Sequence, residues 1–354
     1  MHEIYHPSMA DNQYPLEKRI AIILDFDLTL TEEYMEEPLI AHYMDNVKRA
    51  YHGLRDKNGD VITFDSPSDY FRIVDRWGEP NNGVAYVSQM LHDIRAGVFP
   101  NVTNDDLRHF GQYIRMAPGV PEFFEKLKQE FEGDCELKYY IVSVGLKEMI
   151  LGNPVAKYVD GVYGTEMVSL ANMYDPSKPA VLDSVARIMT PFSKSHSAIE
   201  VAKGGKENVN RVMGHNEYTL DYRNIITIGD GLTDVSQFAY LNKKGSKNIC
   251  VYKMGDNNAF EKINNNKIVR ERVSALLGRD YREGSMLWTY LKRSVNQILS
   301  RGCDFDPLLL DMYRKKKIRD ARIKKIIDEH TEKCTECRGL YGFEWEPPRS
   351  SLQE

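Results

Sequence analysis

Four short, continuously apolar runs constrain the fold of this chain more than any other feature, and they lie at residues 20–24, 139–142, 225–228 and 249–252. Runs of this length and composition are typical of strands that are buried on both faces, as in parallel sheets covered by helices. In open α/β sheets the ligand crevice lies at the carboxyl ends of the strands. Asp25 and Ser143 directly follow the first two runs, and Asp230 follows the third run after Gly229. We therefore expect these three side chains to share one edge of a parallel sheet.

Two carboxylates stand two residues apart where the first run ends, in the sequence Asp25-Phe26-Asp27-Leu28-Thr29. In an extended turn, side chains two residues apart point the same way, which suits a nucleophile and an acid/base on either side of one reacting centre. The same pattern also occurs as an ordinary capped turn, so alone it leaves both interpretations open.

A second acidic pair follows the third run, in the sequence Gly229-Asp230-Gly231-Leu232-Thr233-Asp234. The glycines allow a sharp turn close to a ligand, and Asp234 lies one helical turn beyond Asp230. Four acids in one place would repel one another, and Mg²⁺, which prefers oxygen ligands, would relieve that repulsion. The alternative is a glycine turn that leads to a helix-capping aspartate.

Together these residues resemble the haloacid dehalogenase superfamily, specifically its phosphatase branch, since the two acidic motifs, Ser143 and a later lysine occur in the family's order. The resemblance implies that Asp25 is phosphorylated and that Asp27 protonates the leaving group and then activates water. Dehalogenase members lack an acid at the second position, so Asp27 favours a phosphatase.

The resemblance also implies the ligands of the phosphoryl group and of the metal. Ser143 would bind the phosphoryl oxygens, helped by backbone N–H groups near Val144 and Gly145 at the start of the following helix. The implied Mg²⁺ ligands are Asp25, the carbonyl oxygen of Asp27, and Asp230, with Asp234 supporting or sharing that site.

The phosphate-neutralising lysine has three candidates. Lys194 opens an expected helix at the place where the family carries this residue, and it is our first choice. Lys203 and Lys206 compete with it, because both adjoin the Gly204-Gly205 turn and loop geometry decides which charge reaches a phosphate. For each of them the alternative is a solvated surface lysine.

The positions of the motifs predict a three-layer, Rossmann-like α/β fold with a mainly parallel sheet. The segment between the first two runs, residues 31–116, is too long for an ordinary crossover and reads as a helical cap inserted after the first strand. The catalytic core would comprise residues 1–30 and 117–255, with a small hairpin insertion at 166–190, and residues 256–354 would form a C-terminal helical extension with a basic tail. Helical patterns occur at residues 34–54, 105–114, 120–131, 267–277 and 285–299.

Composition limits the partners. The chain has 354 residues and a net charge of -5, so no global field attracts nucleic acid or an anionic membrane. No apolar stretch is long enough for a membrane span, no secretory signal is recognisable, and the 5 cysteines are scattered, so we expect a cytoplasmic protein. A cap that closes over the site would exclude bulky esters, so we expect a small phosphorylated substrate. The oligomeric state stays open. Cys135 and Cys250 read as buried structural thiols.

Two weaker signals and two rival functions remain. His330, Cys334 and Cys337, with Cys303 as a fourth ligand, have zinc-like spacing, although unrelated terminal thiols are the alternative. The basic stretch at residues 313–325 could contact acidic partners or nucleic acid, although a solvated helix face packed on the core is the commoner outcome for such a stretch. The rivals to a phosphatase are a phosphotransferase that uses the same intermediate and a binding or scaffold protein that retains the fold.

Overall fold

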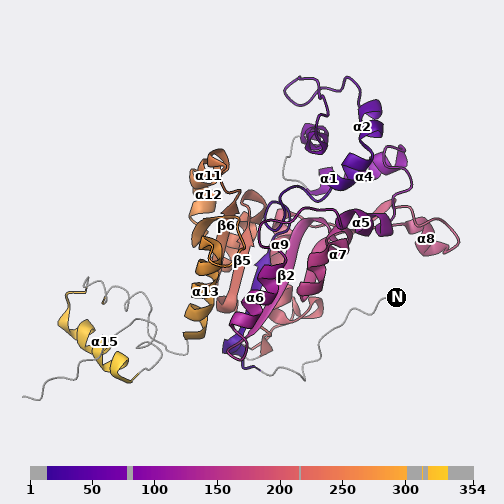
Figure 1. The fold of residues 1–354 in the computed structure, drawn as a ribbon. Helices are drawn as coiled ribbons and strands as arrows, with labels where there is room; N and C mark the ends of the chain where they lie inside the picture. The colour runs from indigo at the N-terminus through magenta and orange to yellow at the C-terminus, as the bar shows by residue number, and fades with distance from the viewer. Residues whose placement is uncertain (1–13, 78–82, 215–216, 301–312, 314–317, 334–354) are drawn as a thin grey trace, which may run out of the picture. The chain divides into compact units, whose positions relative to one another are not determined.

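The computed structural model describes residues 14–77, 83–214, 217–300, 313 and 318–333, and the chain divides into two compact units, Met1–Lys292 and Arg293–Glu354. A seven-stranded sheet with the order β4-β3-β2-β1-β5-β6-β7 forms the centre of the first unit (Figure 1). All neighbouring strands are parallel except β3 and β4, which are antiparallel. The strands are β1 (Arg19–Leu24), β2 (Glu136–Leu146), β3 (Gly161–Val168), β4 (Ser184–Arg187), β5 (Ile225–Gly229), β6 (Lys247–Tyr252) and β7 (Ala275–Gly278). The predicted α/β sheet is confirmed, and the four apolar runs are β1, β2, β5 and β6.

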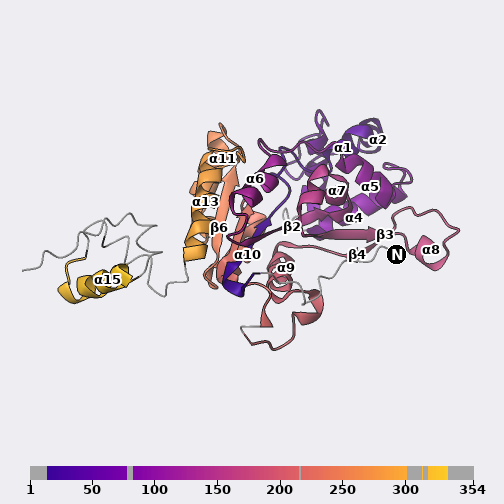
Figure 2. The ribbon, with the colours of Figure 1, turned by 60° about the horizontal axis from the view of Figure 1, so that its bottom comes forward.

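Helices cover both faces of this sheet, which gives the expected three layers (Figure 2). On one face Ala21 and Ile23 of β1 share a buried cluster with α9 (Pro191–Lys203) and α10 (Val235–Asn242). On the other face Tyr139 of β2 packs against Phe123 and Phe124 of α6 (Glu122–Glu130), with ring centroids 6.1 and 4.9 Å apart. Successive strand residues point to opposite faces, so a strand buried on both sides has to be apolar throughout.

The segment between β1 and α6 leaves and re-enters the core at one place. Thr31 and Met116 form an antiparallel bridge, and Ala117 N–H donates to the Leu30 carbonyl over 2.8 Å. Arg108 also pairs with Glu148 at 2.6 Å, which joins the last helix of this segment to the core. The segment, called the cap below, contains α1 (Glu37–His42), α2 (Met44–Ala50), α3 (Phe71–Val74), α4 (Gly83–Arg95) and α5 (Asn104–Gly111).

Two predicted helical stretches are wrong in extent. The stretch at 34–54 is broken at Tyr43, whose ring packs 5.9 Å from that of Phe99, so α1 and α2 are separate helices. The stretch at 267–277 ends early, because residues after α12 (Lys267–Arg270) form strand β7, held by Ser274 N–H donating to the Asn248 carbonyl over 2.6 Å. The sheet therefore extends beyond residue 255, into the region expected to be a helical extension.

The remaining helices complete the two units. They are α7 (Lys147–Gly152), α8 (Leu170–Tyr174), α11 (Asn257–Asn264), α12, α13 (Met286–Leu299) and α15 (Ala321–Lys333). The predicted hairpin is confirmed as the antiparallel pair β3–β4, with α8 between its strands. None of the helices in the described part of the chain has both the length and the apolar character of a membrane span. Cys303, Cys334, Cys337 and residues 314–317 of the basic stretch lie outside the described residues.

Candidate active site

The carboxyl ends of β1 and β5 place Asp25 and Asp230 at the same edge of the sheet, as the sequence predicts. Leu24 pairs in register with Ile228, and Asp25 N–H donates to the Ile228 carbonyl over 2.9 Å. The Asp25 side chain is 5% exposed, and its Oδ1 accepts the Phe26 N–H over 2.8 Å. The first aspartate of the motif is therefore held rigidly by the strand that precedes it.

Lys194 is the only one of the three candidate lysines that reaches these acids. It is fully buried on α9, and its Nζ lies 2.8 Å from Asp25 Oδ2 and 2.7 Å from Asp234 Oδ1. Burial alone would lower the pKa of Lys194, but the charges of Asp234 and Asp25 outweigh it and raise that pKa. Lys203 instead donates to the carbonyls of Val209 and Arg211, and Lys206 is exposed.

The position of Lys194 follows from local helix signals. Thr190 caps α9 by accepting the Ser193 N–H, Pro191 occupies the first turn, and Gly204 ends the helix in the left-handed conformation. These signals fix the start of the helix, and hence the face on which Lys194 lies.

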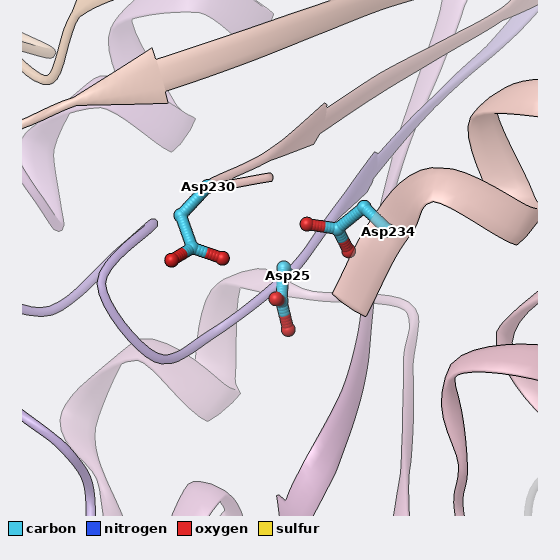
Figure 3. Close-up of side chains that lie close together, drawn as sticks. All are labelled: Asp25, Asp230 and Asp234. Atoms are coloured by element: carbon cyan, nitrogen blue, oxygen red, sulfur yellow. The ribbon is translucent and has the colours of Figure 1, made fainter. Parts of the chain in front are cut away.

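Three carboxylates meet at this edge (Figure 3). One oxygen from each of Asp25, Asp230 and Asp234 lies within 4.8 Å of the other two. Burial, followed by the charges of Asp234 and Asp25, raises the pKa of Asp230 to about 8. Burial likewise raises the pKa of Asp25 to about 7, although Lys194 opposes the shift. Oxygen donors that repel one another in this way fit a hard divalent cation such as Mg²⁺.

Gly229 makes this close approach possible. A Cβ placed on it would lie 2.2 Å from Asp234 Oδ2, so any other residue would displace that carboxylate. Asp234 Oδ2 also accepts the Gly231 N–H over 3.3 Å, which folds the motif back on itself.

Asp27 lies where the core meets the cap. Its Oδ1 accepts the backbone N–H of Met35 over 2.8 Å. Burial, and then the charges of Glu36 and Asp25, raise the pKa of Asp27 well above its usual range. A raised pKa is the direction of shift that a carboxyl group needs to act as a general acid.

The predicted phosphate-binding residues are divided between the cavity wall and the interior. Val144 and Gly145 line a cavity of about 510 Å³ together with Asp25, Asp27 and Asp230. Ser143 is buried and does not line it, and its Oγ accepts the Gly145 N–H over 3.0 Å. Strand β2 continues to Leu146, so the expected helix start near Val144 and Gly145 is wrong by about one turn, and α7 begins only at Lys147.

Sequence reasoning missed the contribution of the cap to this cavity. Tyr34, Glu36 and Tyr86 line it, and the Tyr86 hydroxyl donates to Glu36 Oε1 over 2.5 Å. No motif marks these residues. Glu36 is one of four glutamates in residues 31–40, and nothing in the sequence distinguishes it from the other three.

It also missed two residues that follow β7 and hold the first motif. Arg279, 4% exposed, donates to the Leu28 carbonyl, and the Tyr281 hydroxyl donates to the Thr29 carbonyl over 3.1 Å. Leu28 has a φ of 53°, a conformation that side-chain-bearing residues seldom adopt, so its carbonyl needs a defined partner. The end of the sheet thus fixes the loop that carries Asp25 and Asp27.

The sheet order, the two acidic motifs at adjacent strand ends, the lysine behind them and the segment inserted after β1 agree with the arrangement that the resemblance to the haloacid dehalogenase superfamily implies. An uncharacterized protein of Borreliella burgdorferi is 28% identical over 296 residues, which cover 79% of this chain and 97% of that protein. No family model matches the chain.

Solved structures with some similarity include a phosphoserine phosphatase in apo form, which is 15% identical with a TM-score of 0.44. The match covers 75% of this chain and 97% of the phosphoserine phosphatase chain. A phosphonoacetaldehyde hydrolase-like protein from Oleispira antarctica is 14% identical, with a TM-score of 0.42. The match covers 83% of this chain and 99% of that protein. At these identities and scores, we take the function from the chain's own residues.

Proposed function

We propose that the protein is a Mg²⁺-dependent phosphomonoester hydrolase that forms an aspartyl-phosphate on Asp25. The observation that carries this proposal is the pairing of Asp25 with Lys194 at 2.8 Å beneath a cavity that Asp27 also lines. A carboxylate held by a buried cation and flanked by a second carboxyl group with a raised pKa is equipped for nucleophilic and acid/base work on one ester.

The chain's own residues account for both halves of the reaction. A carboxylate oxygen of Asp25 attacks phosphorus, and the ester P–O bond breaks. The leaving oxygen keeps the electron pair of that bond and takes a proton from Asp27. In the second half, water attacks the phosphoryl group on Asp25 while Asp27 takes a proton from that water. The bond between the Asp25 oxygen and phosphorus breaks, which restores the carboxylate and releases inorganic phosphate. The raised pKa of Asp27 supports its role as the proton donor in the first half.

The ligands proposed for Mg²⁺ are Asp25, the Asp27 carbonyl oxygen, Asp230 and Asp234. Asp234 is already paired with Lys194 at 2.7 Å, so its contribution would be shared between the metal and the lysine. When bound, the ion would neutralise charge on the transferring phosphoryl group.

A small substrate and a cytoplasmic location belong to the same proposal. The cavity of about 510 Å³ lies in the range of small-molecule pockets, and a site shared with a cap suits a metabolite better than a macromolecule. The two cysteines in the described part of the chain, Cys135 and Cys250, are buried and unpaired, which supports a reducing compartment.

The test is hydrolysis of p-nitrophenyl phosphate and a panel of phosphate esters with Mg²⁺, followed by exhaustive chelation and re-addition of the metal. We expect turnover that EDTA abolishes and Mg²⁺ restores. Phosphoryl transfer to added acceptor alcohols would instead identify the phosphotransferase. Failure to hydrolyse any ester would favour the scaffold protein.

A further inference from the structure

Three aromatic side chains of the cap form a continuous wall of the cavity. Tyr34, Phe71 and Tyr86 all line it. The ring centroids of Tyr34 and Phe71 are 4.8 Å apart, and those of Phe71 and Tyr86 are 6.4 Å apart. The face of an aromatic ring carries negative quadrupole potential, so a cation that lies over one of these rings is attracted to it.

Acidic side chains accompany this aromatic wall. Glu36 is 3% exposed, lines the cavity, and receives one hydrogen bond, from the Tyr86 hydroxyl. Asp75 also lines it and has a half-exposed partner, Lys57, at 3.6 Å. Among the described lining residues, Lys262 on α11 supplies the only positive charge, and it is exposed. The cap side of the cavity thus combines aromatic rings with a buried acid.

We propose that this part of the cavity binds a positively charged leaving group, so that the substrate is the phosphate ester of an amino alcohol, with a primary or quaternary ammonium group held by Glu36 and the rings of Tyr34, Phe71 and Tyr86. The inference rests on the proposed phosphatase function and names its substrate class. An ammonium group over aromatic faces gains cation–π attraction, and it gives the buried Glu36 an opposite charge. A carboxylate-bearing leaving group would meet Glu36 and Asp75 instead and would be repelled.

The test separates charge from size. Phosphocholine is compared with 3,3-dimethylbutyl phosphate, which has the same shape without the charge, and phosphoethanolamine is compared with propyl phosphate. Phosphoglycolate serves as an anionic ester. We expect at least one ammonium ester to exceed its neutral counterpart in kcat/KM by about tenfold or more, equivalent to about 1.4 kcal/mol, and phosphoglycolate to be poorer than both. A preference within the phosphocholine pair would indicate a quaternary ammonium group, and a preference within the phosphoethanolamine pair would indicate a primary one. Equal rates within both pairs, or a preference for phosphoglycolate, would overturn the inference.

Variants assign the preference to residues. Glu36→Gln, whose side-chain oxygen can still accept from Tyr86, should reduce the cationic-to-neutral ratio of kcat/KM to within about twofold. The matched control is Glu37→Gln, which alters the adjacent acid outside the cavity lining and should leave the ratio intact. Phe71→Leu should lower the ratio as well, and it provides the answer if Glu36→Gln does not fold. An unchanged ratio in both Glu36→Gln and Phe71→Leu would contradict the assignment.

The two proposals fail in different ways. If p-nitrophenyl phosphate and the neutral esters are not hydrolysed either, the phosphatase function itself is wrong. If those esters are hydrolysed with Mg²⁺ but charge brings no advantage, the phosphatase stands and only the ammonium site is wrong.

Discussion

Replacing Lys194 by methionine should strongly destabilise the first unit in the absence of metal. Methionine keeps much of the apolar length of the side chain but removes the ammonium group that lies 2.8 Å from Asp25 and 2.7 Å from Asp234. Both carboxylates are buried, so each would lose its cationic partner where little solvent screens its charge. Removing one member of a buried ion pair costs about 3–5 kcal/mol. For a unit of this size, that corresponds to a Tm lower by roughly 6–15 °C.

The matched control is Lys203→Met on the same helix. Lys203 Nζ donates only to the carbonyls of Val209 and Arg211, and its side chain is half-buried, so we expect a loss of about 1 kcal/mol or less. Thermal and urea unfolding of both variants in EDTA at pH 8 measures the difference. The loss from Lys194→Met should shrink toward pH 5.5, because the unpaired carboxyl groups can then take up protons, and Mg²⁺ should restore part of it at pH 8. Equal Tm values for the two variants at pH 8 would refute the proposed charge balance.

Four further outcomes test the site. Asp27→Asn should give a burst of p-nitrophenolate approaching one equivalent per enzyme, after which turnover should stall. The p-nitrophenolate leaving group needs little protonation, whereas hydrolysis of the aspartyl-phosphate needs a base. Steady turnover at the wild-type rate would exclude Asp27 as the acid/base. In titrations of rate against Mg²⁺, Asp230→Asn should raise the half-saturating concentration more than Ser143→Ala, since only the former removes a proposed ligand; the reverse order would contradict the metal assignment. Without metal, the wild-type protein should lose stability as the pH rises from 5.5 to 8.5. The pKa of Asp25 is raised to about 7 and that of Asp230 to about 8, so the folded state binds more protons than the unfolded state in this range and ionisation costs stability. Mg²⁺ should stabilise the protein more at pH 8.5 than at pH 5.5, and a Tm in EDTA that increases across this range would contradict the shifts. Arg279→Gln should lower kcat more than it raises KM, because Arg279 holds the loop of Asp25 and Asp27 and does not line the cavity; a change confined to KM would argue against that positioning role.

The central strands were predictable because burial on both faces leaves no freedom in composition. Strands β1 and β5 are buried at nearly every position, and apart from Arg19 and Thr227 their residues are apolar or glycine. Strand β3, with the sequence GVYGTEMV, is only partly buried and contains two glycines, so no such pattern marks it. Strand β7 has only four residues, all partly buried, and its leucines also fit the period of the preceding helix.

The acids of the site were predictable for a related reason, since each follows a recognisable strand. Residues that reach the site from elsewhere were not. Tyr86 contacts Glu36 across 50 positions of the chain, and Arg279 contacts Leu28 across 251. Such contacts depend on how the cap and the sheet edge pack in three dimensions, and no local pattern in one sequence encodes them.

Met35 and Glu36 connect the proposed catalytic acid, Asp27, with the part of the cavity that would bind the leaving group. The Met35 N–H holds Asp27 Oδ1 at 2.8 Å, while the next side chain, Glu36, lines the cavity. Gly145 allows this segment to pack closely against the core, because a Cβ at that position would lie 2.2 Å from Met35 Cε and 3.1 Å from Asp27 Oδ2. A movement of the cap that shifts Glu36 must therefore also shift the hydrogen bond to Asp27. Binding of a leaving group against Glu36 would thus set the orientation of the acid that protonates it, so the fit of the substrate in the cap and the rate of the chemical step are coupled through two adjacent residues.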